Sequence, residues 1–532
     1  MNAKKILFIL SGFITTVSFF NWRGIHVGLS LLLSLGFLIY FTTTKRYETV
    51  EQLLKQVPLP TKLFLIAMAA IVSKSVTASL YRSAAISLLS DFPYVALQVV
   101  AFIGMVYFLS FYLAWFYLVF SKGIFLTLKG SIMLGTRNKW LVGAGFGLLF
   151  FLLLAINQQT PVFFAPRLSY LAGHHPPQYF FFDVIFQTDT DPLFQYYNVF
   201  IKDVPSSRQP LFSLFSFPLV APLYGLGQLL FFVPHLYPTL VMWFQFVLAF
   251  LSGALLHGMA KKQLAYPKLF LLFYLSTYAL IIFPLILERF IFGLFYLALL
   301  IESYSRNDEE RQFALLGAMG TNLLSLLMGA FLIVLNEKEK VKPFLKLFGI
   351  FIGFMAVFGR LPILFYSGTL ADSTRWITFE VGLVHQLMQY SEFVWGSFLF
   401  PATAVNFYIY PRYEQAIVTG FHVGGLLIIA ACLIAAVRNF EKYLVKVAAF
   451  WFGISFLLLG IIGWSANQHN LLLFASFFSF SFIYLFYLFL EQLLSPFTWR
   501  FKVLGALAGF ILLHNLYGLW DLLSFAFRYY YF

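Results

Sequence analysis

The sequence has few of the residues that stabilise secreted proteins or build soluble enzymes. It contains a single cysteine, Cys432, in 532 residues, which excludes a disulfide bond within the chain and a metal site built from several cysteines. Charged residues make up 11% of the chain, whereas about 25% is typical of soluble domains. The sequence also lacks a P-loop, a GxGxxG motif after a strand and an HExxH motif, so we do not expect ATP-driven transport by this chain alone.

Apolar residues take the place of the charged ones. They form 61% of the chain, and Phe alone accounts for 70 residues. A water-soluble fold could not bury so much apolar surface, and a spanning helix needs about 20 apolar residues. We therefore predict an all-α, polytopic transmembrane helical bundle of about 13–15 membrane segments. The predicted spans are 5–20, 27–43, 62–80, 92–120, 139–157, 237–259, 268–286, 290–304, 346–364, 414–437, 443–464, 469–490 and 501–518, with two further apolar stretches at 211–233 and 312–336.

Lys and Arg in short loops predict the orientation of the chain, because such loops stay in the cytoplasm. The N-terminus has a basic start but no small-x-small cleavage site, so we interpret it as an uncleaved first helix. Five helices before residue 158 then place segment 158–210 outside. The inside loops carry Lys4 and Lys5, Lys45 and Arg46, the 122–139 region, Lys261 and Lys262, the 438–446 region, and Arg500 with Lys502.

The same loops account for the net charge of +14, and no basic aromatic module is present, so nucleic acid is not an expected partner. We expect a multi-pass protein of the cell membrane, from composition that of a bacterium, whose working surface faces away from the cytoplasm. Two extracytoplasmic regions of sizeable length follow from this topology, 158–236 and 365–412.

Two apolar stretches conflict with the positive-inside rule if they span the membrane. A full span at 211–233, which contains Pro218 and Pro222, would move Lys261 outside, so we predict that 211–233 lies at the outer interface. Basic residues flank 312–336 on both sides. We predict a hairpin of two short helices there, broken around Gly329, because a hairpin returns both ends to the cytoplasm.

Acidic residues gather in the first outer region. Asp189 and Asp191 lie two residues apart in TDTDP, after Asp183 and before Asp203. A solvated loop with Asp-Pro turn chemistry explains this spacing about as well as a site does. The functional interpretation is a carboxylate general base at the membrane boundary, and a divalent cation bound by Asp189 and Asp191 is the alternative use of the same oxygens. No other cofactor is predicted.

Cationic and polar residues occur on the same predicted face. Arg208 and Gln209 precede Pro210, and a guanidinium can hold phosphate oxygens in a bidentate manner. For each residue alone, an interfacial anchor or a self-neutralising Glu–Arg pair is an equal or better explanation, whereas their gathering from distant parts of the chain indicates a site. The further candidates are Glu288 and Arg289, Arg360, Arg375, His385 and His469.

This pattern resembles the membrane glycosyltransferases of the GT-C fold, which use polyprenyl-phosphate-linked sugars. The matching positions are Thr188-Asp189-Thr190-Asp191 and Ser207-Arg208-Gln209-Pro210-Leu211-Phe212, where Gln209 stands at the position of the family's His. Leu287-Glu288-Arg289-Phe290 is similar to a Glu-bearing outer turn, and Gly320-Thr321-Asn322 to a polar break in a middle helix. The likeness covers about residues 139–365, and members do not usually have five helices before the acidic loop. It implies N-terminal transmembrane helices at 1–135, a GT-C-like core at 136–365, and a second outer loop with C-terminal helices at 366–532.

The resemblance implies a mechanism and its partners. A polyprenyl-phosphate-linked sugar enters from the membrane lipid, and an extracytoplasmic acceptor arrives from the water. Asp189, or alternatively Asp191, takes the acceptor's proton as catalytic base. Arg208 and Gln209, together with Glu288, Arg289, Arg360, Arg375 and His469, bind substrate or its phosphate.

Three other functions are open. A transporter or lipid-linked glycan flippase would place charges near the midplane on broken helices, and 312–336 is such a segment. A polysaccharide polymerase or ligase of another membrane fold would share the chemistry and differ in layout. A non-catalytic membrane scaffold would leave the two polar outer regions unexplained.

Overall fold

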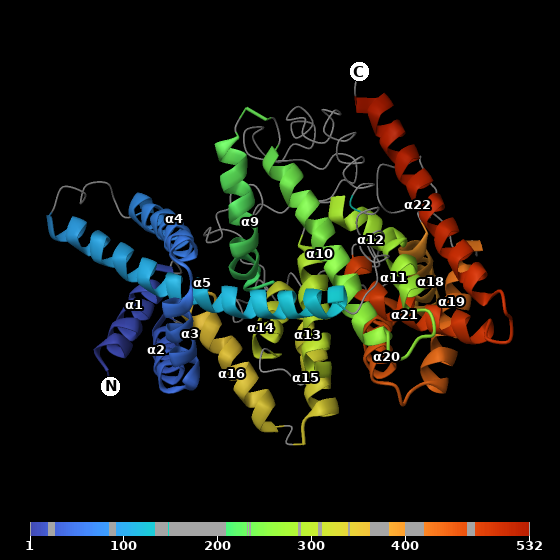
Figure 1. The fold of residues 1–532 in the computed structure, drawn as a ribbon, viewed down its shortest axis with the longest axis horizontal. Helices are drawn as coiled ribbons and strands as arrows, with labels where there is room; N and C mark the ends of the chain where they lie inside the picture. The colour runs from blue at the N-terminus through green and yellow to red at the C-terminus, as the bar shows by residue number, and fades with distance from the viewer. Residues whose placement is uncertain are drawn as a thin grey trace. The chain divides into compact units, whose positions relative to one another are not determined.

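The computed structural model describes residues 2–19, 27–83, 92–133, 147, 209–230, 232–233, 236–285, 289–306, 311–338, 341–361, 382–399, 420–464 and 474–530. Helices form the regular structure in these residues (Figure 1). Six of them are long and apolar enough to cross a membrane, and up to eight spans result if each of two bent helix pairs is one span. The prediction of a helical chain is therefore confirmed for the described residues, and the six apolar helices are compatible with a multi-pass membrane protein. The six are Ala96–Leu118, Thr239–Ala260, Gly420–Arg438, Tyr443–Ile461, Ala475–Leu493 and Arg500–Trp520.

The chain forms two compact units, each assembled from segments far apart in the sequence. Unit 1 comprises Met1–Thr127, Tyr196–Gly225 and Glu309–Leu370. Unit 2 comprises Leu128–Gln195, Leu226–Asp308 and Ala371–Phe532. We describe each unit by itself.

Unit 1 begins with helices α1 (Ala3–Phe19), α2 (Val27–Thr43), α3 (Lys45–Gln56), α4 (Leu59–Ser83) and most of α5 (Phe92–Met133). Small residues let these helices approach closely. Thr16 of α1 and Ser34 of α2 share a hydrogen bond of 2.6 Å, and Gly12 lies where a methyl group would meet the side chain of Leu38. Close packing of small residues is the usual means of helix association in lipid.

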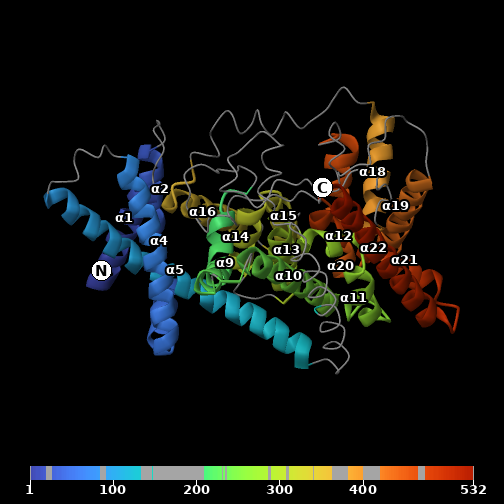
Figure 2. The same ribbon diagram turned by 90° about the horizontal axis from the view of Figure 1, so that it is seen from above.

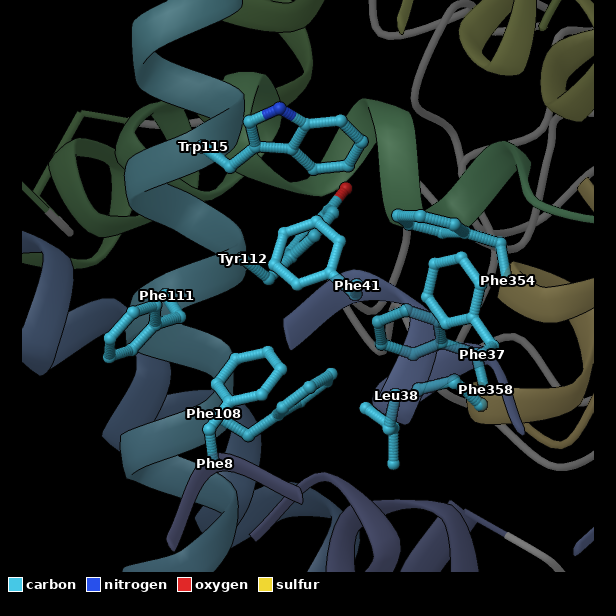
Figure 3. Close-up of a pocket in the computed structure, with 11 residues that line it drawn as sticks. Phe8, Phe37, Leu38, Phe41, Phe108, Phe111, Tyr112, Trp115, Phe354 and Phe358 are labelled. Atoms are coloured by element: carbon cyan, nitrogen blue, oxygen red, sulfur yellow. The ribbon is translucent and has the colours of Figure 1, made fainter. Parts of the chain in front are cut away.

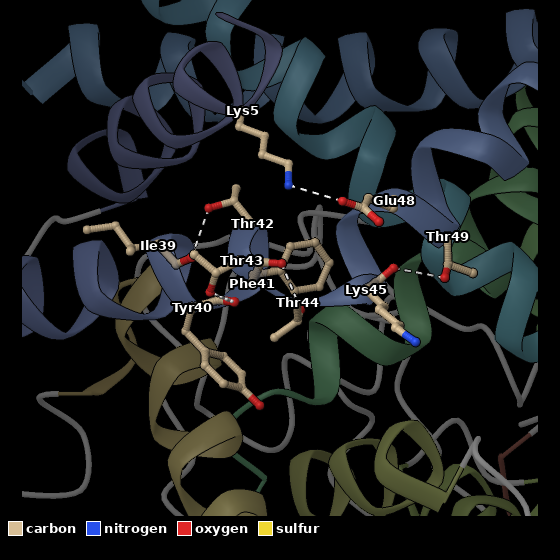
Figure 4. A network of polar contacts seen from close by, with 10 residues as sticks. All are labelled: Lys5, Ile39, Tyr40, Phe41, Thr42, Thr43, Thr44, Lys45, Glu48 and Thr49. Atoms are coloured by element: carbon tan, nitrogen blue, oxygen red, sulfur yellow. Dashed lines mark hydrogen bonds and ion pairs between the residues drawn. The ribbon is translucent and has the colours of Figure 1, made fainter. Parts of the chain in front are cut away.

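Helix α3 was missed by the search for apolar runs because it is polar, with the sequence KRYETVEQLLKQ. It follows α2 after a sharp bend of 65°. The hydroxyls of Thr42, Thr43 and Thr44 donate to the carbonyl oxygens three residues earlier, and these bonds satisfy the last carbonyls of α2 at the bend (Figure 4). Lys5 Nζ lies 3.3 Å from Glu48 Oε1, which joins α1 to α3.

The remaining helices of unit 1 include the predicted hairpin. Its arms are α14 (Arg311–Thr321) and α15 (Ser325–Asn336), so two short helices are confirmed. The predicted position of the break was wrong: the chain turns at 322–324, and Gly329 lies inside α15. A side chain at Gly329 would begin 2.5 Å from Leu315 Cδ1, so this glycine serves close packing of the two arms. Helices α9 (Phe212–Leu229) and α16 (Val341–Val357) complete the set.

Helix α9 contains Pro218 and Pro222 and has a largely buried surface in unit 1. Its Phe215 packs edge-on against Phe313 of α14, with ring centroids 5.4 Å apart. Tyr112 of α5 donates its hydroxyl to the carbonyl oxygen of Leu214 at 2.9 Å. The stretch 211–233 is thus an internal element of unit 1 along its first half, whereas its predicted depth in the membrane stays a prediction.

Unit 2 contains the long helices α10 (Leu236–Ala260) and α13 (Phe290–Arg306), which pack on each other. The predicted single span at 268–286 is in fact broken. It consists of α11 (Pro267–Leu275), α12 (Tyr278–Ile282) and the short 3-10 helix η3 (Phe283–Leu285), bent by 64°. The side-chain amide of Asn515 donates to Ser276 O at 2.8 Å, so a neighbouring helix satisfies the carbonyl at the break.

The C-terminal part of unit 2 holds α18 (Leu383–Phe398), α19 (Gly420–Arg438), α20 (Tyr443–Ser455), α21 (Ala475–Leu493) and α22 (Arg500–Tyr530). The interpretation of 365–412 as an outer loop was incomplete, because α18 is a helix with a buried face that runs beside α19 (Figure 2). A π-helical turn, η5 (Phe456–Ile461), extends α20. Cys432 is buried and its thiol lies 3.3 Å from Phe482 O.

Three loops that the charge pattern assigned to one side lie together in unit 2. Glu491 at the end of α21 accepts the backbone N–H groups of Ala265 and Tyr266 at 3.0 and 2.7 Å. Arg500 Nε donates to the Tyr266 hydroxyl at 2.9 Å, and its guanidinium lies 4.9 Å from the centre of that ring. Lys442 Nζ lies 3.4 Å from Gln263 O. The basic loops at 261–266, 438–446 and 500–502 therefore belong to the same end of unit 2.

Candidate functional site

Four of the candidate residues belong to the described part of the chain, and one of them, His385 of unit 2, is described below with its neighbours. Of the other three, Gln209 and Arg360 lie in unit 1, and Arg289 lies in unit 2. The predicted roles of the others stay predictions, since these residues lie outside the described ranges: Asp189, Asp191, Arg208, Glu288, Arg375 and His469.

Gln209 and Pro210 form the turn that opens α9. The carbonyl oxygen of Gln209 accepts the N–H of Phe212 at 3.2 Å, and Pro210 is buried. Leu211 lies just before α9, and its N–H donates to Gly320 O at 3.0 Å. The backbone therefore joins the start of α9 directly to the end of α14, 109 residues later.

Gly320 is the residue that permits this contact. An added Cβ there would lie 2.8 Å from Leu211 Cβ and 3.1 Å from Phe215 Cδ2. Thr321 donates its hydroxyl back to Gly317 O at 2.7 Å, and Asn322 Oδ1 accepts the N–H of Leu324 at 3.0 Å. The hydroxyl and amide groups thus satisfy the backbone at the helix break. Residues 209–212 of one segment singled out in the sequence consequently lie against 320–322 at the tip of the hairpin.

Arg360 follows α16 after a tight turn. Gly359 has φ of +61°, a conformation that favours glycine, and the N–H of Arg360 bonds to Met355 O at 2.7 Å. Burial lowers the pKa of the guanidinium to about 10, which leaves it charged at neutral pH. No ion pair holds Arg360 within the described ranges. The site thus has a fixed, partly buried cation that could bind an anion.

An aromatic pocket lies next to α16 in the same unit (Figure 3). A cavity of about 30 Å³ lies among α1, α2, α5 and α16. Two lining residues, Tyr112 and Trp115, carry a polar group, and the Tyr112 hydroxyl donates to Leu214 O. A cavity of this size is a gap in the packing of the aromatic side chains, and it is much smaller than the pockets that hold ligands. The lining residues are Phe8, Phe37, Leu38, Phe41, Phe108, Phe111, Tyr112, Trp115, Phe354, Val357 and Phe358.

Arg289 begins α13, and its carbonyl oxygen accepts the N–H of Gly293 at 3.1 Å. It belongs to unit 2, whereas Gln209 and Arg360 belong to unit 1. The structure therefore gives geometry for two of the predicted residues in one unit and for the third in the other.

Sequence reasoning named His385 but missed the polar cluster of unit 2 to which it belongs. His385, Gln389 and Glu392 occupy positions i, i+4 and i+7 of α18, and the Gln389 amide lies 3.0 Å from His385 Nε2. Glu392 Oε2 lies 4.0 Å from Nε2 of His422 on α19. The helical spacing of these three residues was a usable signal, but it was hidden because the segment was interpreted as a loop.

Burial determines whether the Glu392 carboxyl of this cluster is protonated. The side chains of Glu392 and His422 are 16% and 7% exposed. Helix α18 is not among the candidate membrane spans, and burial raises the pKa of the Glu392 carboxyl to about 8. Within the described residues, no group of three or more His, Cys, Asp or Glu side chains could hold a metal ion. The cluster therefore differs from a metal centre and carries a carboxyl group that titrates near neutral pH.

Comparisons with protein-family models, with curated proteins and with solved structures give no match to this chain. The glycosyltransferase resemblance accordingly depends on the short motifs quoted above.

Proposed function

We propose that this chain is a membrane glycosyltransferase that moves a sugar from a polyprenyl-phosphate carrier to an extracytoplasmic acceptor, which is a glycan, lipid or protein of the cell surface. The observation that carries the proposal is the hydrogen bond from Leu211 N to Gly320 O. It brings together Leu211 and Gly320, which belong to two separate motifs of the resemblance.

The proposed chemistry is a displacement at the anomeric carbon. The acceptor hydroxyl forms the new C–O bond as the bond between the anomeric carbon and the phosphate oxygen breaks. Asp189, with Asp191 as the alternative, accepts the hydroxyl proton. The polyprenyl phosphate departs with an additional negative charge, which Arg208 and Arg360 stabilise. A divalent cation held by Asp189 and Asp191 would do part of the same work, and it remains an alternative to direct base catalysis.

One feature of unit 1 supports a lipid-linked substrate. Arg360 supplies a cation just after α16, in the segment that also contributes Phe354 and Phe358 to an aromatic cluster. A phosphate attached to an apolar chain requires such a charge close to an apolar surface. Gln209 donates or accepts a hydrogen bond where the family has an imidazole, and Glu288, Arg289, Arg375 and His469 are the proposed second group of substrate contacts.

A transporter or lipid-linked glycan flippase is the second candidate. The observation in its favour is the hairpin of α14 and α15, because broken helices build the midplane sites of transporters. A flippase moves an intact lipid-linked glycan and cleaves no bond, so the chemistry of the product separates the two functions.

The test is a transfer assay on the full chain in proteoliposomes. Polyprenyl phosphates that carry a radiolabelled hexose or pentose are supplied, and release of polyprenyl phosphate is measured. Asp189→Asn and Asp191→Asn are compared with Asp203→Asn, which removes an acid from the same region. We expect transfer to fall by at least about a hundredfold in one of the first two variants and to persist in the third. Full activity of both variants would overturn the base assignment, and intact donor with transbilayer movement would favour the flippase.

A further inference from the structure

The buried cluster of unit 2 is built on a tight helix pair. Gly425 of α19 lies against the backbone carbonyl of Ser391 on α18, where a side chain would have no room. A side chain at Gly424 would likewise clash, because an added Cβ would lie 2.3 Å from the ring of Trp395. This packing fixes His422 opposite Glu392 and leaves neither helix free to turn the two groups away from each other.

The carboxyl of Glu392 is not neutralised by its surroundings. Its Oε1 is buried and has no hydrogen-bond partner within the described part of the chain. Burial of a carboxylate in this condition is strongly unfavourable, so the site favours the protonated acid unless a cation forms beside it. His422 at 4.0 Å is the group that can become that cation.

The other helices packed on α18 bring no competing charge to Glu392. The turn η5 carries no titratable residue, and α12 contributes only Tyr278. The ionisable groups of α21 are Tyr484, Tyr487 and Glu491, which bond to Gln263, Tyr266 and the backbone of 265–266. On α18 itself, His385 lies two turns before Glu392 and next to Gln389. Among the described residues, burial is the cause of the raised pKa of the Glu392 carboxyl, and the ionisable side chain across the helix pair is His422 at 4.0 Å.

We infer that Glu392 and His422 form a proton-binding site in unit 2, which uses none of the residues assigned to sugar transfer. One proton is held by the pair. When it moves, the O–H bond of Glu392 breaks and an N–H bond forms at Nε2 of His422, so that a neutral acid and a neutral imidazole become a carboxylate and an imidazolium. The pair stays electrically neutral in both forms.

Transfer of this proton requires a local movement that brings Glu392 and His422 closer together. The present separation of 4.0 Å exceeds a hydrogen bond by about 1 Å. The π-helical turn η5 lies beside α18, and Tyr390 of α18 shares a hydrogen bond of 2.6 Å with Ser455 just before that turn. Gly463, with φ of +70°, lies against the amide of Gln386. Turns of π-helix are frequent at functional positions because they allow small shifts of register.

The experiment is pH-difference infrared spectroscopy of the full chain in lipid nanodiscs. We expect a protonated carboxyl band at about pH 6 that disappears as the pH rises through about 8. Glu392→Gln should remove the band, whereas Glu441→Gln, which changes an exposed acid, should keep it. His422→Gln should raise the midpoint, which corresponds to at least about a fivefold higher proton affinity of Glu392.

Three results would overturn the inference. The first is an unchanged band in Glu392→Gln. The second is an unchanged midpoint in His422→Gln, since the carboxyl would then titrate without its partner. The third is a midpoint that moves when sodium replaces choline in the buffer, which would identify a metal-cation site in place of a proton site. Transfer activity is not the readout, so the inference and the proposed function fail independently.

Discussion

Arg311 and Glu337 form an ion pair across 26 residues of chain, between the first residue of α14 and the residue that follows α15. The pair closes the base of the hairpin, so both ends of this apolar segment lie at one level. The arms have 11 and 12 residues, or about 17 Å each. A bilayer core of about 30 Å is too thick for either arm to cross. We therefore predict that the segment enters the membrane and returns on the same side.

Labelling of introduced cysteines tests this return. Gln312→Cys and Lys338→Cys, each in a Cys432→Ser background, should react with a membrane-impermeant maleimide from the same side of oriented vesicles. Asn322→Cys at the tip should react more slowly from that side, because it lies deeper. Labelling of 312 and 338 from opposite sides would show that the arms together cross the membrane, and the hairpin would be rejected.

The contact between α9 and the hairpin tip predicts an unequal response of two glycines. Gly320→Ala should lower the free energy of unfolding by about 1–3 kcal/mol, because the new methyl group meets Leu211 Cβ at 2.8 Å and Leu211 is itself bonded to Gly320 O. Gly349→Ala in α16 faces open space and should be neutral or stabilising by up to about 1 kcal/mol. Thermal unfolding in nanodiscs measures both. Equal effects of the two changes would mean that the α9 contact is not close.

The hairpin also shows what a sequence can and cannot determine. Flanking Arg and Lys residues predicted that 312–336 returns to its starting side, since positive loops have a preferred location. The break was placed at Gly329 because glycine weakens helices, but glycine also allows helices to touch, and here Leu315 occupies the space. Only the position of a neighbouring helix distinguishes these two uses. The true break at 322–324 directly follows Gly320 and Thr321, at the short polar stretch 320–322 that the resemblance had indicated.

Helix α18 was overlooked for a related reason. Its sequence, LVHQLMQYSEFVWGSF, is too polar to be recognised as a membrane span. Its polar residues recur on one buried face, and their burial becomes visible only once α19 and α21 cover them. The candidate residues at 189, 191 and 208 were chosen from type and spacing, which identify chemistry but give no distances. Of that set, the geometry of Gln209, Arg289 and Arg360 is now available.

Glu491 should be a strong structural contributor at the other end of unit 2. Both of its carboxylate oxygens accept backbone N–H groups, from Ala265 and Tyr266. Glu491→Gln replaces one acceptor by an NH₂ group that faces a donor, and we expect a loss of about 2 kcal/mol. Glu441→Gln, at an exposed position, should stay within about 0.5 kcal/mol of the parent protein. Chemical or thermal unfolding compares the two variants. If Glu491→Gln lowers the free energy of unfolding as little as Glu441→Gln does, Glu491 does not stabilise the fold.

The Glu392 carboxyl predicts a specific dependence of stability on pH. Its pKa is raised from 4.5 to about 8 in the folded protein, so the folded state binds this proton more tightly than the unfolded chain. The contribution is complete below pH 4.5 and is lost as the pH rises through about 8. Glu392→Gln keeps a neutral side chain at every pH. Its melting temperature should therefore equal that of the parent protein near pH 4.5 and exceed it increasingly toward pH 8.5.

The direction of this effect separates a buried acid from an ordinary structural ion pair. If Glu392 were held as a carboxylate by a permanently charged His422, its pKa would be lowered, and the Gln variant would be less stable at neutral pH. Melting curves at several pH values between 4.5 and 8.5 distinguish the two cases, with Glu441→Gln as the control whose difference from the parent stays constant. If the gain in melting temperature of Glu392→Gln grows with pH, the acid at position 392 destabilises the folded protein. Buried acids kept at such a cost are characteristic of groups that exchange protons in function.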